Sequence, residues 1–227
     1  MKKIFIIMLL IVLLVTSSGC SFHFQGTIPD YEKKEYILED TANLTDIIIT
    51  DQDTPIIVNL SSDNKIHLEY HDAVDQSEYY EIKENQNSLK IKKNAEDNYG
   101  FFLFGDRVIT DSYKDVRLVL SLPENLKVNL EIKSPDSDVK IDGVNINQLI
   151  IKSKDGDISL DNVSITEKIV CITDDGDVRG NLNGKESDYS ITIKSDDGDS
   201  KIRNKKDGNI VLEVTTDDGD IDILFNE

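Results

Sequence analysis

Apolar and polar residues alternate over many short stretches of the chain, and in the second half this alternation follows a repeated motif. Five copies read LEIKSPDSDVKI (130–141), LIIKSKDGDISL (149–160), IVCITDDGDVRG (169–180), ITIKSDDGDSKI (191–202) and LEVTTDDGDIDI (212–223). Alternate apolar positions are typical of strands that bury one face. Each copy is therefore predicted to form a strand, a tight corner and a second strand.

The last aspartate of each corner is a common reference position. These reference aspartates are separated by 19, 20, 22 and 21 residues, and they are Asp138, Asp157, Asp177, Asp199 and Asp220. Two positions earlier each copy has another aspartate, namely Asp136, Asp155, Asp175, Asp197 or Asp218. Four copies place glycine between the two aspartates, which suits a corner because glycine adopts positive φ and Asp bonds nearby amides. A period near 20 residues predicts an all-β fold, a β-solenoid (single-stranded β-helix) in which each coil stacks on the next.

Four residues before each reference aspartate the chain has a small hydroxyl residue. These residues, at what we call position −4, are Ser134, Ser153, Thr173, Ser195 and Thr216. They share the parity of the apolar residues, so we expect them to point inward and form a hydroxyl ladder near the corner. Cys171 stands where other copies have Ile or Val, and is predicted to be a small core residue rather than a reactive thiol.

The first half of the domain alternates less regularly. Short strands are predicted over 47–60, 65–70, 79–83, 89–92 and 116–122. We expect residues 41–129 to form wider or imperfect coils of the same solenoid, ahead of the regular repeats in 130–227. The alternative is a small separate β domain.

The first 19 residues predict an export signal. Lys2 and Lys3 precede an uninterrupted apolar run from Ile4 to Val15, which is too short to span a bilayer comfortably. The run leads into Ser17-Ser18-Gly19-Cys20, an ending that resembles a lipobox, so we expect cleavage before Cys20 and lipid attachment to its thiol. The alternative is an ordinary secretory signal with an incidental cysteine. Residues 20–40 are then predicted to be a polar tether that holds the domain 41–227 at a membrane, outside the cytoplasm.

The net charge limits the kinds of partner that the chain can bind, and the cysteine content limits its disulfide bonds. The chain has 44 acidic and 25 basic residues, for a net charge of −19, so nucleic acid is excluded as an expected partner. The acidic surface favours solubility, cations or a basic partner. Only two cysteines are present. With one lipidated and the other in the core, no disulfide is expected despite export.

Three features resemble the bacterial putative-adhesin family, a β-solenoid domain of unknown function. They are the stretch SLPENLKVNLEIKS (121–134), the stretch NSLKIKK (87–93) and the serial Ser-x-Asp-Gly-Asp-Val/Ile pattern. The resemblance covers roughly residues 40–227. It implies surface adhesion and supplies no catalytic residues, and this chain departs from the family in being more acidic at its corners.

The corner aspartates are the candidate metal site. Carboxylates stacked about 4.8 Å apart would repel each other by about 0.9 kcal/mol per pair in bulk water. Calcium would relieve this repulsion, since carboxylate and carbonyl oxygens suit it. The alternative is that each Asp caps its own corner through backbone amides. The copies match neither the nonapeptide calcium repeat nor a helix–loop–helix calcium loop.

An aromatic insertion is the candidate partner-binding site. Tyr99, Phe101, Phe102 and Phe104 lie in a polar, irregular stretch, where an exposed apolar patch would indicate contact with a partner or membrane. The alternative is that these rings close one end of the core. No catalytic motif is present, so we expect no enzyme and no cofactor other than calcium.

These observations favour a lipid-anchored binding or scaffold protein of the cell envelope, an adhesin that contacts cell-wall polymer or an envelope protein. The first alternative is an envelope-stress or signalling accessory that binds a neighbouring membrane protein. The second is a calcium-stabilised structural solenoid without an adhesive role. The strand near Ile221 to Phe225 is expected to be an open sheet edge that could pair with another copy.

Overall fold

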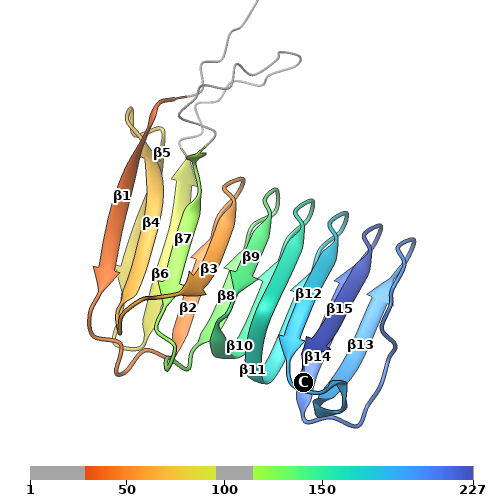
Figure 1. The fold of residues 1–227 in the computed structure, drawn as a ribbon. Coiled ribbons are helices and arrows are strands. Elements are labelled where there is room, and N and C mark those ends of the chain that lie inside the picture. The colour runs from red at the N-terminus through yellow and green to blue at the C-terminus, as the bar shows by residue number, and fades with distance from the viewer. Residues whose placement is uncertain (1–28, 96–114, 227) are drawn as a thin grey trace, which may run out of the picture. The chain divides into compact units, whose positions relative to one another are not determined.

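Short β-strands joined by tight corners make up the computed structural model, which describes residues 29–95 and 115–226 (Figure 1). In chain order the strands are β1 (Tyr31–Leu38), β2 (Asp46–Thr50), β3 (Ile56–Leu60), β4 (Ile66–Ala73), β5 (Glu78–Glu84), β6 (Ser88–Ala95), β7 (Leu118–Leu122), β8 (Asn129–Lys133), β9 (Val139–Asp142), β10 (Asn145–Lys152), β11 (Ile158–Ile172), β12 (Val178–Asn183), β13 (Tyr189–Ser195), β14 (Ile210–Thr216) and β15 (Ile221–Asn226). A 3-10 turn, Glu186–Asp188, precedes β13. The described part of the chain is therefore all-β, as predicted.

The strands form two facing sheets that share one long strand. The sheet that we call sheet I runs β5-β6-β2-β8-β10-β11-β14-β13, and the sheet that we call sheet II runs β1-β4-β7-β3-β9-β11-β12-β15. Strand β11 joins them, because Ile158–Leu160 pairs in sheet II whereas Lys168–Ile172 pairs in sheet I. Each corner carries the chain from sheet I to sheet II, and the corners lie along one edge (Figure 1).

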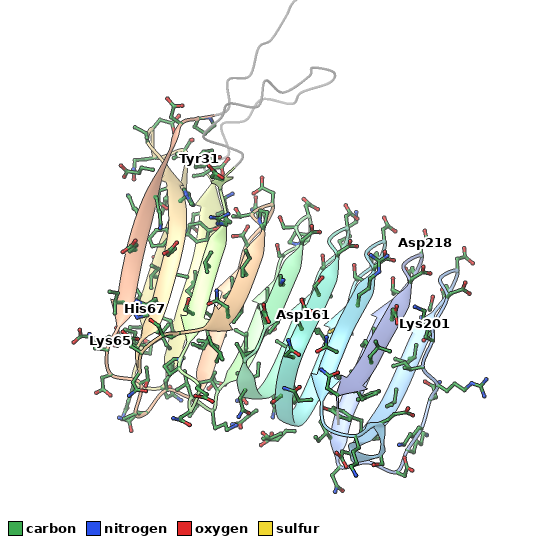
Figure 2. All side chains as sticks on the ribbon, viewed as in Figure 1. Tyr31, Lys65, His67, Asp161, Lys201 and Asp218 are labelled. Carbon is green, nitrogen blue, oxygen red and sulfur yellow. The ribbon has the colours of Figure 1, made fainter. Side chains whose placement is uncertain are left out.

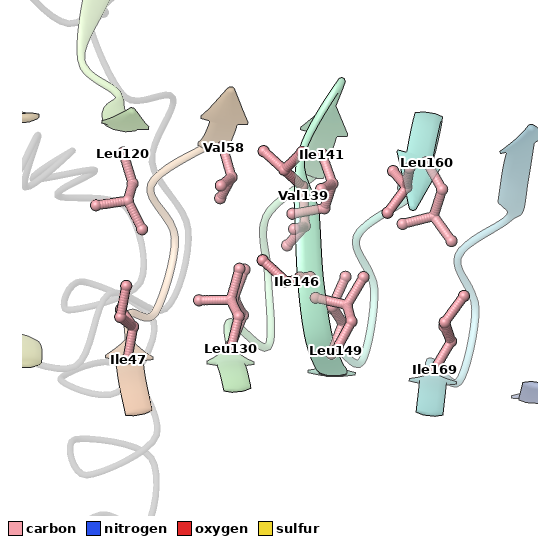
Figure 3. Close-up of a cluster of buried hydrophobic side chains, with 14 of the residues drawn as sticks. Ile47, Val58, Leu120, Leu130, Val139, Ile141, Ile146, Leu149, Leu160 and Ile169 are labelled. Atoms are coloured by element: carbon pink, nitrogen blue, oxygen red, sulfur yellow. The ribbon is translucent and has the colours of Figure 1, made fainter. Parts of the chain in front are cut away.

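The core lies between the two sheets. Alternate residues of each strand are buried, as in β8, where Leu130 and Ile132 are buried and their neighbours are not. Figure 3 shows the side chains of sheet I, such as Ile47 and Leu149, facing those of sheet II, such as Val58 and Leu160. Cys171 is fully buried in this core, where burial raises the pKa of its thiol to about 12. Its predicted role as a small core residue is confirmed.

The coils do not stack in chain order throughout, which corrects the sequence-based expectation. In the middle they do, since Leu130 pairs with Leu149 and Leu149 with Ile169. At the C-terminal end, however, β14 and β15 pair with β11 and β12, and β13 lies outside them on β14. The fifth repeat thus lies between the third and the fourth. All copies present the same inward pattern, so the pattern alone does not specify which coil is the neighbour.

The N-terminal end of the stack contains antiparallel strands. Coil β2/β3 lies between coils β6/β7 and β8/β9, and its pairs with both are parallel. By contrast β1, β4 and β5 pair antiparallel with their neighbours, so these strands are not the imperfect coils that were predicted. Residues 31–38 were predicted to belong to the polar tether, but they form β1. Tyr36 and Leu38 pack against the core, while charged neighbours mask this alternation in the sequence.

Candidate functional site

The hydroxyl residues at position −4 form the inner layer of each corner. Thr173 Oγ1 accepts a hydrogen bond from Gly176 N at 3.2 Å, and Thr216 Oγ1 accepts one from Gly219 N at 3.0 Å. The same hydroxyls donate to the neighbouring coil, Thr173 to Lys154 O at 3.1 Å and Thr216 to Asp174 O at 3.2 Å. The predicted hydroxyl ladder therefore closes four of the five corners, and in three of these, at Ser153, Thr173 and Thr216, it also binds one coil to the next. Ser134 Oγ of the first repeat is buried without a hydrogen-bond partner among the described residues.

The reference aspartates form a second ladder, on the outer side of the corners. Oδ1 of four of them accepts a hydrogen bond from the backbone N–H of the reference aspartate in the next coil of the stack, and Asp199, in the last coil, is a donor only. The N–Oδ1 distances are 3.0 Å for Asp157 to Asp138, 2.8 Å for Asp177 to Asp157, 2.7 Å for Asp220 to Asp177 and 2.9 Å for Asp199 to Asp220. We call these five residues the aspartate column. Their carboxylates cap the neighbouring coil, and not their own corner as the sequence suggested.

The second set of predicted aspartates, at position −2, points into solvent. Asp136, Asp155, Asp175, Asp197 and Asp218 are all exposed, and Asp218 marks their place in Figure 2. Lys154 Nζ lies 3.1 Å from Oδ1 of Asp155. In residues 29–95 and 115–226, no three His, Cys, Asp or Glu side chains lie close enough to hold a metal ion.

The stacked corners form one strongly acidic edge. We define the acidic edge as the five corner segments 135–138, 154–157, 174–177, 196–199 and 217–220. It holds thirteen aspartates and one basic residue, Lys154, and thus contributes twelve of the nineteen net negative charges. Charge of one sign on one edge creates a field that attracts cations and basic partners.

The aspartate column ends where coil β2/β3 begins. Thr50 pairs with Lys133, which places Asp51 beside Ser134 at position −4 and Pro55 at the reference position. Proline has neither a backbone N–H nor a carboxylate, so it continues the column in neither direction. Asp51 takes over the role of the hydroxyl, because its Oδ1 accepts a hydrogen bond from Thr54 N at 2.9 Å.

Coil β6/β7 places a lysine at the same position, and a buried charged cluster results. Lys92 pairs with Thr50, so Lys93 lies beside Asp51, with Tyr80 on its other side. Lys93 Nζ lies 2.7 Å from Asp53 Oδ1 and 2.9 Å from Glu78 Oε2, and the lysine side chain is only 6% exposed. Tyr80 donates its hydroxyl proton to Asp51 Oδ2. We call Asp51, Asp53, Glu78, Tyr80 and Lys93 the charged cluster.

Burial and nearby charges determine the protonation states of Lys93 and Tyr80 in this cluster. Burial acts to lower the pKa of Lys93, but the carboxylates of Asp53 and Asp51 outweigh it and hold that pKa above its ordinary value. Burial raises the pKa of Tyr80 well above its usual range, and the nearby Asp51 carboxylate adds to this. At neutral pH the cluster therefore contains an ammonium group and a neutral phenol. Sequence reasoning missed the cluster, whose signal is the replacement of the position −4 hydroxyl by a charge.

Two sets of predicted site residues lie outside the described residues. They are the lipidation site Cys20 and the aromatic residues Tyr99, Phe101, Phe102 and Phe104. These aromatic residues belong to segment 96–114, which separates β6 from β7 in the sequence. No helix in the described part of the chain is long and apolar enough to cross a membrane.

Two solved structures were found to be similar to the chain, and the first of them shares its fold. A putative cell adhesion protein from Clostridium sporogenes has 12% sequence identity and a TM-score of 0.64, covering 86% of this chain and 100% of its own. A putative adhesin from Bacteroides fragilis has 10% identity and a TM-score of 0.35, covering 86% of this chain and 97% of its own. No curated protein matches the chain.

A family model settles the relationship. The model described as Toastrack DUF4097 matches residues 44–227, which include every corner of the acidic edge. This match confirms the predicted kinship with the putative-adhesin group of unknown function and supports a β-solenoid-like repeat fold. The chain belongs to the Toastrack DUF4097 family.

Proposed function

We propose that the protein is a lipid-anchored, extracytoplasmic binding or scaffold module of the bacterial cell envelope, with an adhesin-like role. The observation that carries this proposal is the use of the corner chemistry. The polar groups most regular in the sequence, the position −4 hydroxyls and the aspartate column, bond one coil to the next. A chain whose repeated polar residues hold its framework together suits the display of surfaces.

The surfaces on display differ in charge. On sheet I basic and acidic residues pair with each other, as Lys133 does with Glu131 at 2.9 Å and Lys168 with Glu213 at 2.9 Å. On the acidic edge only three of the thirteen aspartates have an ion pair, Asp155 with Lys154, Asp177 with Arg179 and Asp196 with Lys194. A basic segment of an envelope protein would therefore bind along the acidic edge, whereas an anionic wall polymer would be repelled there and would contact a sheet face.

The export signal and Cys20 support the location. A doubly acylated cysteine would anchor the chain firmly, and β1 begins only eleven residues after it. The solved Clostridium sporogenes protein, which shares the fold, is described as a putative cell adhesion protein, and this agrees with an adhesive role.

Labelling with palmitate tests the anchor. The full chain is expressed in a bacterial host beside Cys20→Ala and, as a matched control, Cys171→Ala. We expect label and membrane association in the native chain and in Cys171→Ala, and neither in Cys20→Ala. Label that persists in Cys20→Ala would overturn the anchor.

Cell aggregation tests the binding role. Cells that express the native chain should sediment faster, or be retained better on purified cell-wall fragments, than cells that express Cys20→Ala. Equal behaviour of the two strains, at equal amounts of protein, would contradict the adhesive role.

A further inference from the structure

The outer face of sheet I carries a net positive charge. Side chains alternate between the two faces of a strand, so residues between the buried positions point outward. Among the described residues these outward positions hold seven lysines and four acidic residues. The lysines are Lys83, Lys90, Lys92, Lys133, Lys152, Lys168 and Lys194, and the acidic residues are Asp46, Glu81, Glu131 and Glu213. This face is therefore basic within a chain whose net charge is −19.

Four of these lysines share one row that crosses the strands. The register of sheet I places seven residues side by side, from β6 at one end to β13 at the other. In spatial order they are Lys92, Thr50, Lys133, Lys152, Ile172, Thr215 and Lys194, and we call them the lysine row. All four lysines are exposed, and none of the seven residues is acidic. Neighbouring strands lie about 4.8 Å apart, so the row extends over about 29 Å.

The lysine row has few carboxylate partners. Oε1 of Glu131 lies 2.9 Å from Lys133 Nζ and 4.0 Å from Lys152 Nζ, so one carboxylate serves two ammonium groups. Lys92 forms no ion pair with any residue in 29–95 or 115–226. Ion pairs between exposed side chains are weak, so an anionic ligand can replace Glu131 as the partner of these lysines.

The basic residues along sheet II are neutralised one by one. Each of three basic side chains there has a carboxylate of its own, in the pairs Lys140 with Asp161, Arg179 with Asp177 and Lys201 with Asp222. Unneutralised positive charge is therefore a feature of sheet I, and within it of the lysine row.

We propose that the lysine row binds a linear polyanion with repeated phosphate groups, a polymer of the cell wall, laid across the strands of sheet I. This proposal rests on the proposed function and specifies the face through which such a module binds an anionic polymer. Lysine ammonium groups bind phosphate oxygens as point charges, which suits a flexible chain without one fixed geometry. The hydroxyls of Thr50 and Thr215 can donate hydrogen bonds to phosphates between the lysines.

The half of the row near β6 is the more favourable for an anion. In each repeat the acidic edge begins two residues after the lysine row. After Lys133 and Lys152 that place is taken by Pro135 and Lys154, which carry no negative charge. Toward β13 it is taken by aspartates, namely Asp174, Asp217 and Asp196. We therefore expect Lys133 and Lys152 to contribute most to binding.

A single polymer chain fits the lysine row better than a membrane surface does. The row is one residue wide, with the acidic edge on one side and Glu131 and Glu213 in the next outward row on the other. A bilayer, like any wide anionic surface, would cover these carboxylates together with the lysines, so attraction and repulsion would largely cancel. A flexible chain can follow the lysines alone.

The test measures binding of fluorescent inorganic polyphosphate to the full chain in phosphatidylcholine nanodiscs. We expect fluorescence anisotropy to rise with polyphosphate and not with neutral dextran. High salt should abolish the rise, because exposed charges are screened. Nanodiscs that contain phosphatidylglycerol, added as competitor, should not displace the polyphosphate.

Two double variants separate the lysine row from a general charge effect. Lys133→Gln/Lys152→Gln should weaken polyphosphate binding by about fivefold or more. Lys140→Gln/Lys201→Gln is the matched control, because it removes the same charge from exposed, ion-paired lysines along sheet II. It should bind as the native chain does. Thermal melts confirm that both variants fold.

Three results would overturn the inference. They are no anisotropy change with polyphosphate, equal binding by the two double variants, or displacement by phosphatidylglycerol nanodiscs, which would assign the face to a membrane. Retention of native cells on wall fragments, together with equal binding by the two variants, would reject the lysine row and leave the proposed function intact. Polyphosphate binding without palmitate labelling would reject the anchor and leave the lysine row intact.

Discussion

The two ends of the stack place different kinds of side chain at position −4 of their corners. In the C-terminal repeats a hydroxyl at position −4 closes the corner, as Thr173 and Thr216 do. In the two coils at the N-terminal end, Asp51 and Lys93 occupy that position. A hydroxyl is satisfied by the backbone around it, whereas a buried charge requires a charged partner. The regular end is therefore built from interchangeable units, and the N-terminal end from a cluster whose members depend on one another.

The largest effect is expected from breaking the charged cluster. Lys93→Met leaves the carboxylates of Asp53 and Glu78 without their buried cation, and should lower the free energy of unfolding by about 3 kcal/mol. Lys90→Met, on the exposed face of the same strand, is the control, with a loss below about 0.5 kcal/mol. Denaturant unfolding measures both. Equal losses would show that the cluster does not stabilise the N-terminal end.

In the regular end, replacing a corner glycine is expected to destabilise the fold through a steric clash with the neighbouring coil. A Cβ atom at Gly176 would lie 2.1 Å from Gly156 O and 2.8 Å from Thr173 Oγ1, so backbone would have to move. Gly176→Ala should cost about 2 kcal/mol, and Ser137→Ala, at the same position of the first repeat, much less. Thermal melts decide. A Gly176→Ala variant as stable as Ser137→Ala would contradict the close stacking of corners.

The hydroxyl ladder predicts a somewhat smaller effect. Thr216→Val preserves shape but removes the acceptor for Gly219 N and the donor to Asp174 O, within a fully buried site. The loss should be about 1–2 kcal/mol, and Thr216→Ser should recover most of it. If the Val and Ser variants unfold at the same denaturant concentration, packing rather than hydrogen bonding explains how Thr216 stabilises the corner.

The smallest effect concerns an exposed pair at the N-terminal end, outside the charged cluster. The His67 side chain, followed by the backbone N–H of Lys65, lowers the pKa of Asp63 to about 2. Because the folded pKa lies below the ordinary 3.8, this pair stabilises the fold above pH 3.8, and the contribution disappears as pH falls through about 2. NMR titration of Asp63 should show this low pKa, and His67→Phe should raise it. An unchanged pKa in that variant would exclude the imidazole as the cause.

The sequence predicts the regular end well, because its chemistry repeats. Alternating apolar residues and the Asp-Gly-Asp corners identify strands β8 to β15, and the parity of Thr173 and Thr216 predicts their inward hydroxyls. The order of the coils is not predictable from these residues, since the fourth and fifth repeats offer equivalent inward surfaces to the third. Tertiary pairing decides between them.

The charged cluster escapes prediction for a different reason. Lys93 and Asp51 are 42 positions apart in the chain, and only the pairing of β6 with β2 brings them together. Read singly, each resembles an exposed polar residue at a strand end. The column of position −4 residues, aligned through the register of all coils, reveals both as buried replacements for a hydroxyl.

Substitutions in the aspartate column can distinguish the two roles that the sequence left open for it, a metal site and a cap of backbone N–H groups. A metal edge needs the negative charge of each carboxylate, whereas a backbone cap needs only its Oδ1 acceptor. Asp157 is suitable for the distinction, because its Oδ1 accepts from Asp177 N at 2.8 Å and its side chain is exposed. Asparagine retains a carbonyl acceptor without the charge, and alanine retains neither.

The most direct measurement is therefore the thermal melt of Asp157→Asn and Asp157→Ala beside the native chain, each with calcium and with chelator. A backbone-capping column predicts that Asp157→Asn melts near the native chain. It also predicts that Asp157→Ala melts at least about 2 °C lower, and that calcium changes none of the three. If both variants fall equally, and only the native chain is stabilised by calcium, the column is a metal edge and the account is wrong.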